Sequence, residues 1–141
     1  MSSVGELVGS PGLAPTSMEQ AGVAIVHAFD RKYKTRVAAL NPYGIYTIPE
    51  VSSFGETEET CKEKNIDYVV GRALYENNAR GKITGDLEGI TKLVVAAATR
   101  KVIGIHVIGE RATELVESGH VAMQLGATAH RGSARGFTNR R

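Results

Sequence analysis

RKVIGIHVIG, residues 100–109, is the stretch of sequence that decides the fold of this 141-residue chain. Its apolar residues and glycines predict a strand that ends in a turn, and residues 110–124 continue as an amphipathic helix. A charged turn at residues 99–101 joins this strand to an earlier apolar strand over residues 90–98. A small sheet that is covered by a helix on one face usually buries its other face against something else. The pattern therefore predicts part of a larger assembly.

The segments around this hairpin predict an α+β fold, a small and mostly antiparallel sheet with flanking helices. The closing helix places apolar residues on one stripe. These residues are Ala112, Leu115, Val116, Gly119 and Met123. Upstream, the composition predicts extended segments over 45–54, 67–73 and 82–85, and a helix over 56–64. Pro49 restricts the first of these segments to an edge strand or a bulge.

The composition bounds the class of protein. A chain with 42% hydrophobic and 23% charged residues is globular, and its apolar runs are too broken for a transmembrane helix. The single cysteine, Cys61, excludes an internal disulfide and a cysteine-rich metal site, so we expect a cytoplasmic protein. The positive net charge comes from four arginines in residues 127–141. The rest of the chain is slightly acidic, which predicts neither a nucleic-acid partner nor a membrane partner.

The chain divides into three predicted parts. Residues 1–12 are expected to be the end of a strand and a loop, and a helix is expected to begin at Pro15. The apolar face expected for that helix consists of Met18, Ala21, Gly22, Ile25 and Phe29. A turn, NPYG at residues 41–44, marks a boundary, so that the predicted parts are 1–43, 44–126 and a disordered tail at 127–141.

Several motifs, taken in order, resemble the pyridine nucleotide–disulfide oxidoreductase flavoproteins. TIPE at 47–50 and GIHVIG at 104–109, with Ala112 and Glu114 behind it, resemble the C-terminal dimerisation domain of that family. VGELVG at 4–9 and LAPTS at 13–17 resemble its last FAD-binding element. The resemblance implies that residues 1–43 end an FAD-binding domain and that residues 44–126 form an incomplete dimerisation domain.

Four further stretches resemble the transhydrogenase branch of that family. They are SMEQ at 17–20, HAFD at 27–30, YGIYTIPE at 43–50 and VGRA at 70–73. The resemblance implies a homodimeric parent enzyme that uses FAD to transfer hydride between NADPH and NAD, with no redox disulfide. No Cys-x-x-x-x-Cys pair occurs in the chain, which agrees with this branch.

The resemblance also implies three cofactor-binding residues, Gly5, Glu6 and Ala14. In the family an acidic residue after this glycine, usually Asp, hydrogen-bonds the flavin ribityl chain. Glu6 is one methylene longer, so its reach differs. The helix that begins near Ala14 would aim its N-terminus at the flavin pyrimidine ring, where the helix dipole favours an electron-rich group. No catalytic residue and no metal ligand are predicted.

What the sequence lacks predicts an inactive fragment. No Gly-x-Gly-x-x-Gly motif follows a predicted strand, so neither dinucleotide-binding fold is expected. The resemblance stops after Gly126, where the family continues with a strand and a final helix. A shifted or artificially ended reading frame would produce such a break.

Other interpretations stay open at this point. The chain could be a free-standing dimerisation module, or a fragment of a dihydrolipoyl dehydrogenase-like disulfide reductase. The two polar candidates His106 and Glu50 are expected to be structural, and His120 is expected to form a surface pair with Glu117. Cys61 is expected to be an exposed or half-buried thiol.

Overall fold

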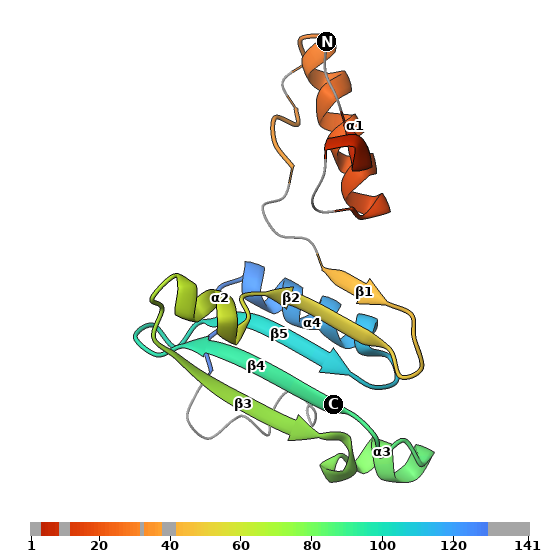
Figure 1. The fold of residues 1–141 in the computed structure, drawn as a ribbon, viewed down its shortest axis with the longest axis vertical. Coiled ribbons are helices and arrows are strands. Elements are labelled where there is room, and N and C mark those ends of the chain that lie inside the picture. The colour runs from red at the N-terminus through yellow and green to blue at the C-terminus, as the bar shows by residue number, and fades with distance from the viewer. Residues whose placement is uncertain (1–3, 9–11, 32, 38–41, 130–141) are drawn as a thin grey trace. The chain divides into compact units, whose positions relative to one another are not determined.

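A computed structural model describes residues 4–8, 12–31, 33–37 and 42–129 of the chain. The chain splits into two compact units, Met1–Asn41 and Pro42–Arg141, which we call unit 1 and unit 2 (Figure 1). Within the described residues, no helix is both long enough and apolar enough to cross a bilayer.

Unit 1 contains a 3-10 helix, η1 (Gly5–Val8), and a longer helix, α1 (Ala14–Ala28). The expected end of a strand before residue 12 is therefore wrong for the described residues 5–8, which form η1. Gly5 adopts a positive φ of 83°, which an extended strand does not allow. Its amide donates to the side chain of Gln20 on α1 at 2.8 Å, and this bond ties η1 to the helix.

The apolar face expected for α1 is mostly exposed within unit 1. Met18, Ile25 and Phe29 are 76%, 59% and 74% exposed, whereas the buried residues of the helix are Thr16 and Val26. A helix in water normally turns its apolar stripe toward a core. The periodicity therefore predicted the helix, but unit 1 does not itself supply the surface that would bury the stripe.

Unit 2 is built on a five-stranded sheet in which every neighbouring pair of strands is antiparallel (Figure 1). Its strands are β1 (Tyr43–Ile45), β2 (Val51–Gly55), β3 (Tyr68–Leu74), β4 (Ile90–Ala96) and β5 (Val102–Ile108), in the order β1-β2-β5-β4-β3. Its helices are α2 (Glu58–Glu63), η2 (Tyr75–Asn77), α3 (Ala79–Thr84) and α4 (Ala112–Gln124). This arrangement confirms the predicted α+β fold, and the decisive hairpin forms its centre as β4 and β5.

The helices α2 and α4 lie over opposite faces of the sheet (Figure 1). The core lies under α4, where Phe54, Ile105, Val107, Ala112 and Val116 are buried with the ring of Tyr75. Gly119 of α4 lets the helix approach β5, because a Cβ at this position would lie 2.5 Å from the Ile105 side chain. Of the predicted stripe, Leu115 is the member that is exposed.

Two short segments differ from the prediction. Residues 45–54 are not one extended segment, because Tyr43–Ile45 pairs with Val51–Gly55 as a hairpin and Pro49 lies in the connection. Residues 82–84 are not extended either, since they end α3. The side chain of Asn78 caps α3 by accepting from the amide of Arg80 at 3.2 Å, and Gly85 follows in the left-handed conformation.

Residues 127–129 are a further correction, because they pair with the rest of unit 2 instead of joining a disordered tail. Thr128 forms a β-bridge with Lys101, and the Val102 amide donates to the carbonyl of Ala127 at 3.0 Å. Backbone pairing of this kind extends the ordered region past Gly126. Residues 130–141 of the predicted tail lie outside the described residues.

Candidate functional site

The three predicted flavin-binding residues lie in unit 1 at the starts of its two helices. Gly5 and Glu6 belong to η1, and Ala14 is the first residue of α1. The Gly5 amide already donates to Gln20, so it is engaged within the unit. The side chain of Glu6 lies outside the described parts of the structure. Its reach toward a ribityl chain therefore stays a prediction.

The first turn of α1 has the electrostatic character that an electron-rich ligand needs. No side chain caps the helix at Leu13, a proline occupies the first turn, and no acidic residue lies there. The first turn therefore has no acidic side chain beside the partial positive charge of the helix N-terminus. A helix start of this kind offers backbone dipoles to an electron-rich group and carries no acidic side chain, so the role of Ala14 toward a flavin stays a prediction.

A groove of about 420 Å³ lies elsewhere in unit 1, between α1 and residues 31–37. Val23, Val26 and Val37 contribute to an apolar lining, and His27 and Arg31 contribute basic groups. Neither Gly5 nor Ala14 lines this groove. It carries no nucleophile paired with a base, so its chemistry is limited to contact with an apolar or acidic surface.

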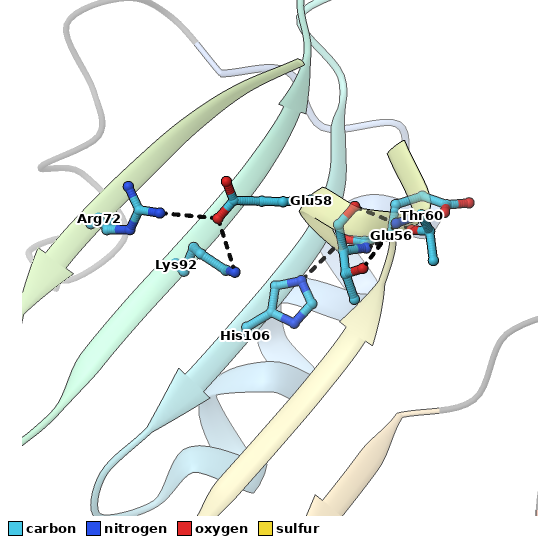
Figure 2. A network of polar contacts seen from close by, with 7 residues as sticks. Glu56, Glu58, Thr60, Arg72, Lys92 and His106 are labelled. Atoms are coloured by element: carbon cyan, nitrogen blue, oxygen red, sulfur yellow. Dashed lines mark hydrogen bonds and ion pairs between the residues drawn. The ribbon is translucent and has the colours of Figure 1, made fainter. Parts of the chain in front are cut away.

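A polar network joins α2 to the sheet of unit 2 (Figure 2). Arg72 on β3 and Lys92 on β4 are cross-strand partners, and both donate to one carboxylate oxygen of Glu58, at 3.0 and 3.2 Å. Glu56, before α2, pairs with Lys64 behind it at 2.6 Å, and this bond lowers the pKa of the Glu56 carboxyl. Glu58 thus ties the first turn of α2 to the sheet, and the pair of Glu56 with Lys64 joins the two residues that flank the helix.

His106 on β5 belongs to the same network (Figure 2). Its Nε2–H donates to the main-chain carbonyl of Glu56 at 3.0 Å, which fixes the tautomer. Burial lowers the pKa of the imidazole, and the charge of nearby Lys92 lowers it further. The hydrogen bond to Glu56 acts in the opposite direction. The residue holds the junction between β2 and α2, so its predicted structural role agrees with the contacts.

We expect the stability of unit 2 to fall on acidification through His106. The folded protein lowers the pKa of His106 below its ordinary value of 6.5, so folding favours the neutral ring. The stabilising contribution is therefore complete above about pH 6.5 and is lost as the pH falls through the lowered pKa. Thermal unfolding followed by circular dichroism at pH 7.5 and 5.5 should show a smaller difference for His106→Gln than for the unchanged chain. An equal difference in both proteins would contradict this assignment.

The other polar candidates have structural surroundings. His120 contacts Glu117 at 3.3 Å, which agrees with the predicted pair, and its ring packs in a tilted arrangement on the ring of Phe54, with the centroids 4.2 Å apart. The Glu50 carboxylate accepts from Thr113 at 3.4 Å. Cys61 is fully buried on α2, so its expected exposure is wrong, and burial raises the pKa of its thiol. In the described ranges, no group of three His, Cys, Asp or Glu side chains could hold a metal ion.

Sequence reasoning missed two features of unit 2. The pairing of Glu58 with Arg72 and Lys92 depends on the register of three elements that are distant in sequence. The ring of Tyr75 lies between Gly89 and Gly109, where a Cβ would approach it within 2.6 and 2.7 Å. Its hydroxyl donates to the Glu110 carbonyl at 3.1 Å, and burial raises its pKa to about 12. The glycines beside the turns, Gly89 and Gly109, were the sequence signal that could have indicated this close packing around the Tyr75 ring.

Comparison with known sequences locates the similarity. Residues 41–137 match the pyridine nucleotide-disulphide oxidoreductase dimerisation domain, a match that extends past Gly126. A soluble pyridine nucleotide transhydrogenase of Mycobacterium bovis is 44% identical over 126 residues, which are 89% of this chain and 27% of the relative. A soluble pyridine nucleotide transhydrogenase of Colwellia psychrerythraea is 38% identical over 122 residues, which are 86% and 26% of the two chains. The chain thus spans about a quarter of these relatives.

Comparison with solved structures supports the fold. An HOCl-induced flavoprotein disulfide reductase, RclA from Escherichia coli, matches with a TM-score of 0.78 and 18% identity over 95% of this chain and 33% of that one. LpdA from Mycobacterium tuberculosis matches with a TM-score of 0.75 and 24% identity over 95% and 31% of the two chains. At identities this low, the structural match establishes the arrangement of helices and strands. The chemistry has to be argued from the individual residues.

Proposed function

The chain belongs to the pyridine nucleotide-disulphide oxidoreductase family through its dimerisation domain. On this basis we propose that it is part of a flavin-dependent transhydrogenase. In this proposal unit 2 forms the contact between subunits, and unit 1 supplies part of the flavin site. The parent enzyme transfers hydride between NADPH and NAD, with FAD as the carrier. The observation that carries the proposal is the 44% identity to a soluble transhydrogenase over 89% of this chain.

The role of each unit follows from its residues. FAD, when bound, accepts hydride from one nicotinamide nucleotide and passes it to the other. The uncapped first turn at Ala14 would orient the flavin ring by its backbone dipoles, and Gly5 and Glu6 would lie along the ribityl chain. The sequence contains no Gly-x-Gly-x-x-Gly motif after a predicted strand, so we expect no fold in this chain that binds either nucleotide. The chain alone is therefore proposed to be inactive.

The two alternative functions predict different experimental results. A free-standing dimerisation module would self-associate with no need for flavin, and a dihydrolipoyl dehydrogenase-like parent would require a redox disulfide. The identity of 44% to a soluble transhydrogenase over 89% of this chain favours the transhydrogenase over a disulfide-reductase parent. A cytoplasmic location and the lack of a nucleic-acid partner stay predictions.

A chimaera tests the proposal directly. We expect that replacing the aligned segment of the Mycobacterium bovis enzyme with the 126 matching residues of this chain yields a flavin-loaded enzyme that reduces NAD with NADPH. The chain alone, mixed with FAD and both nucleotides, should show no turnover above a buffer blank. Visible absorbance measures flavin retention and a coupled assay measures turnover. A folded chimaera with no flavin and no turnover would refute the proposal, and so would turnover by the chain alone.

A Glu6→Ala chimaera separates the flavin contact from the fold. If Glu6 lies along the ribityl chain, its removal should weaken FAD retention about tenfold, since a hydrogen bond to a charged group contributes roughly 1.5 kcal/mol. Leu7→Ala is a matched control, because Leu7 is the exposed next residue of the same 3-10 helix. Equal flavin retention by both variants would remove Glu6 from the site.

A further inference from the structure

The short helix α2 lies on the face of the sheet opposite the core under α4 (Figure 1). Cys61 of α2 and Val94 of β4 are both fully buried, yet neither belongs to the core cluster. Val94 lies two residues from Lys92 on the same strand, so it projects to the face on which Lys92 meets Glu58 of α2. The helix therefore closes a small apolar contact of its own, separate from the core.

Two sets of polar contacts join this helix to the strands beneath it (Figure 2). Glu58, the first residue of α2, accepts from Arg72 on β3 and Lys92 on β4. Before the helix, the carbonyl of Glu56 accepts from the ring of His106 on β5 at 3.0 Å. The attachment therefore depends on a carboxylate that must be charged and on an imidazole that lies under the junction between β2 and α2.

The helix itself is too short to persist without these contacts. It contains 6 residues, whereas isolated helices shorter than about 12 residues are marginal in water. Its capping box, formed by Thr57 and Thr60, is local and does not join it to the sheet. Segments held by few buried contacts open at a lower free energy than the whole domain. Release of Glu56 and Glu58 would therefore free the helix while the pairing between strands stays intact.

We propose that residues 56–66, which we call the latch, open locally in acid while the sheet and α4 stay folded. Acid acts on two of the contacts in the same direction. A proton on Glu58 removes the charge that attracts Arg72 and Lys92. A proton on His106 places a charge where the junction buries the ring, and opening of the latch returns that charge to water. Both protons therefore favour the open state.

The charged side chains that act on His106 come from β4 and α2. Lys92, its cross-strand partner, disfavours a second cation, whereas Glu58 and Glu59 favour it. Ser53, its partner on β2, carries no charge. Burial has the largest influence and lowers the pKa of His106 below its ordinary value of 6.5 in the closed state. The closed state is therefore favoured above about pH 6.5, and this advantage is lost as the pH falls through the lowered pKa.

The reaction rate of Cys61 reports opening of the latch in the full chain, because the closed latch buries this thiol. The probe is a dithiodipyridine, which still reacts with thiols in acid. Dividing each rate by that of the urea-unfolded chain at the same pH removes the effect of pH on the thiol itself. At pH 7.5, Glu58→Gln should raise this ratio about tenfold, and Arg72→Gln, which leaves Lys92 in place, should raise it less.

Glu63→Gln is the matched control, because Glu63 is an exposed residue of the same helix and its replacement should leave the ratio unchanged. Arg72→Gln also covers the case in which Glu58→Gln fails to fold. A ratio in the folded variants equal to that of the unchanged chain would overturn the latch.

Acidification tests the trigger. Between pH 7.5 and 5.5 the ratio should rise at least about threefold in the unchanged chain and by a smaller factor in His106→Gln, which has no ring to protonate. A ratio that does not change with pH in the unchanged chain would overturn the acid sensitivity.

Hydrogen exchange followed by mass spectrometry distinguishes local opening from unfolding of the whole unit. At pH 7.5, Glu58→Gln should speed the exchange of amides in residues 57–66, whereas residues 102–108 of β5 should keep their protection. Equal loss of protection in both segments would show that the unit unfolds as a whole, and it would overturn the latch.

Discussion

Replacing Gly104 with alanine should destabilise unit 2 by about 3 kcal/mol, in the upper range of overpacking effects. A Cβ at this position would lie 2.0 Å from the carbonyl oxygen of Glu56 and 3.1 Å from its carbonyl carbon. Both atoms belong to the backbone, so no side chain can move aside. Relief requires the β2–α2 junction to leave the sheet, which breaks the bond from the Glu56 amide to the Ile103 carbonyl at 2.8 Å.

The same displacement removes the bond between His106 and the Glu56 carbonyl, so several interactions fail together. Urea unfolding followed by far-ultraviolet circular dichroism measures the free energy of unfolding. Gly22→Ala is the matched control, because a Cβ there meets no atom within 4 Å and alanine favours the helix. It should leave stability unchanged or raise it. A Gly104→Ala variant as stable as the unchanged chain would show that Glu56 does not approach β5 this closely.

Ile105→Ala should lower the free energy of unfolding by about 3–4 kcal/mol, as large-to-small substitutions do in a closed core. Ile105 is 1% exposed and lies at the centre of the cluster under α4. Gly119 gives no side chain that could fill the space left behind, because the helix already meets Ile105 through a bare Cα. The cavity would therefore persist, and the loss of packing adds to the loss of apolar burial.

The matched control for this variant is Ile83→Ala, since Ile83 is 85% exposed on α3. The two changes remove the same atoms, so the difference in their unfolding free energies isolates burial. We expect Ile83→Ala to shift stability by less than about 0.5 kcal/mol. Similar losses for both variants would contradict the placement of Ile105 in the core. Together with Gly104→Ala, this pair tests one residue on each face of β5.

The motifs with regular apolar patterns predicted their elements well. The hairpin of β4 and β5 and the closing helix follow from residues 90–124, where the apolar runs of the two strands and the helical stripe were the signals. Short segments were predicted unevenly, since α2 lies within the helix expected at 56–64, whereas the end of α3 was expected to be extended. α3 depends on the side-chain cap from Asn78 and on Gly85 in the left-handed conformation, and six residues carry too little periodicity to outweigh an extended pattern.

For the candidate site, too, one part could be predicted from the sequence and another part could not. Ordered motifs pointed to the family, and the comparisons confirm the dimerisation domain. The assignments of Gly5, Glu6 and Ala14 to the flavin stay predictions, because the side chain of Glu6 lies outside the described residues and the chain spans only 27% of the relative that it matches. The exposed stripe on α1 shows a similar limit: its periodicity is local and predicts a helix, whereas burial depends on contacts that the described residues of unit 1 do not make to Met18, Ile25 and Phe29.

The sequence by itself determined the central hairpin, the helices α1, α2 and α4, and the family to which they belong, because periodicity and motif order are properties of neighbouring residues. Only the tertiary structure decided which residues meet. Cys61 is buried because α2 folds over β5, and Glu58 finds Arg72 and Lys92 through strand register. A line of aliphatic residues across the sheet, made by Ile45, Val51, Ile108, Ile90 and Leu74, forms for the same reason. Its five members lie on five strands spread over residues 43–108, and only hydrogen-bonded pairing places them on one line.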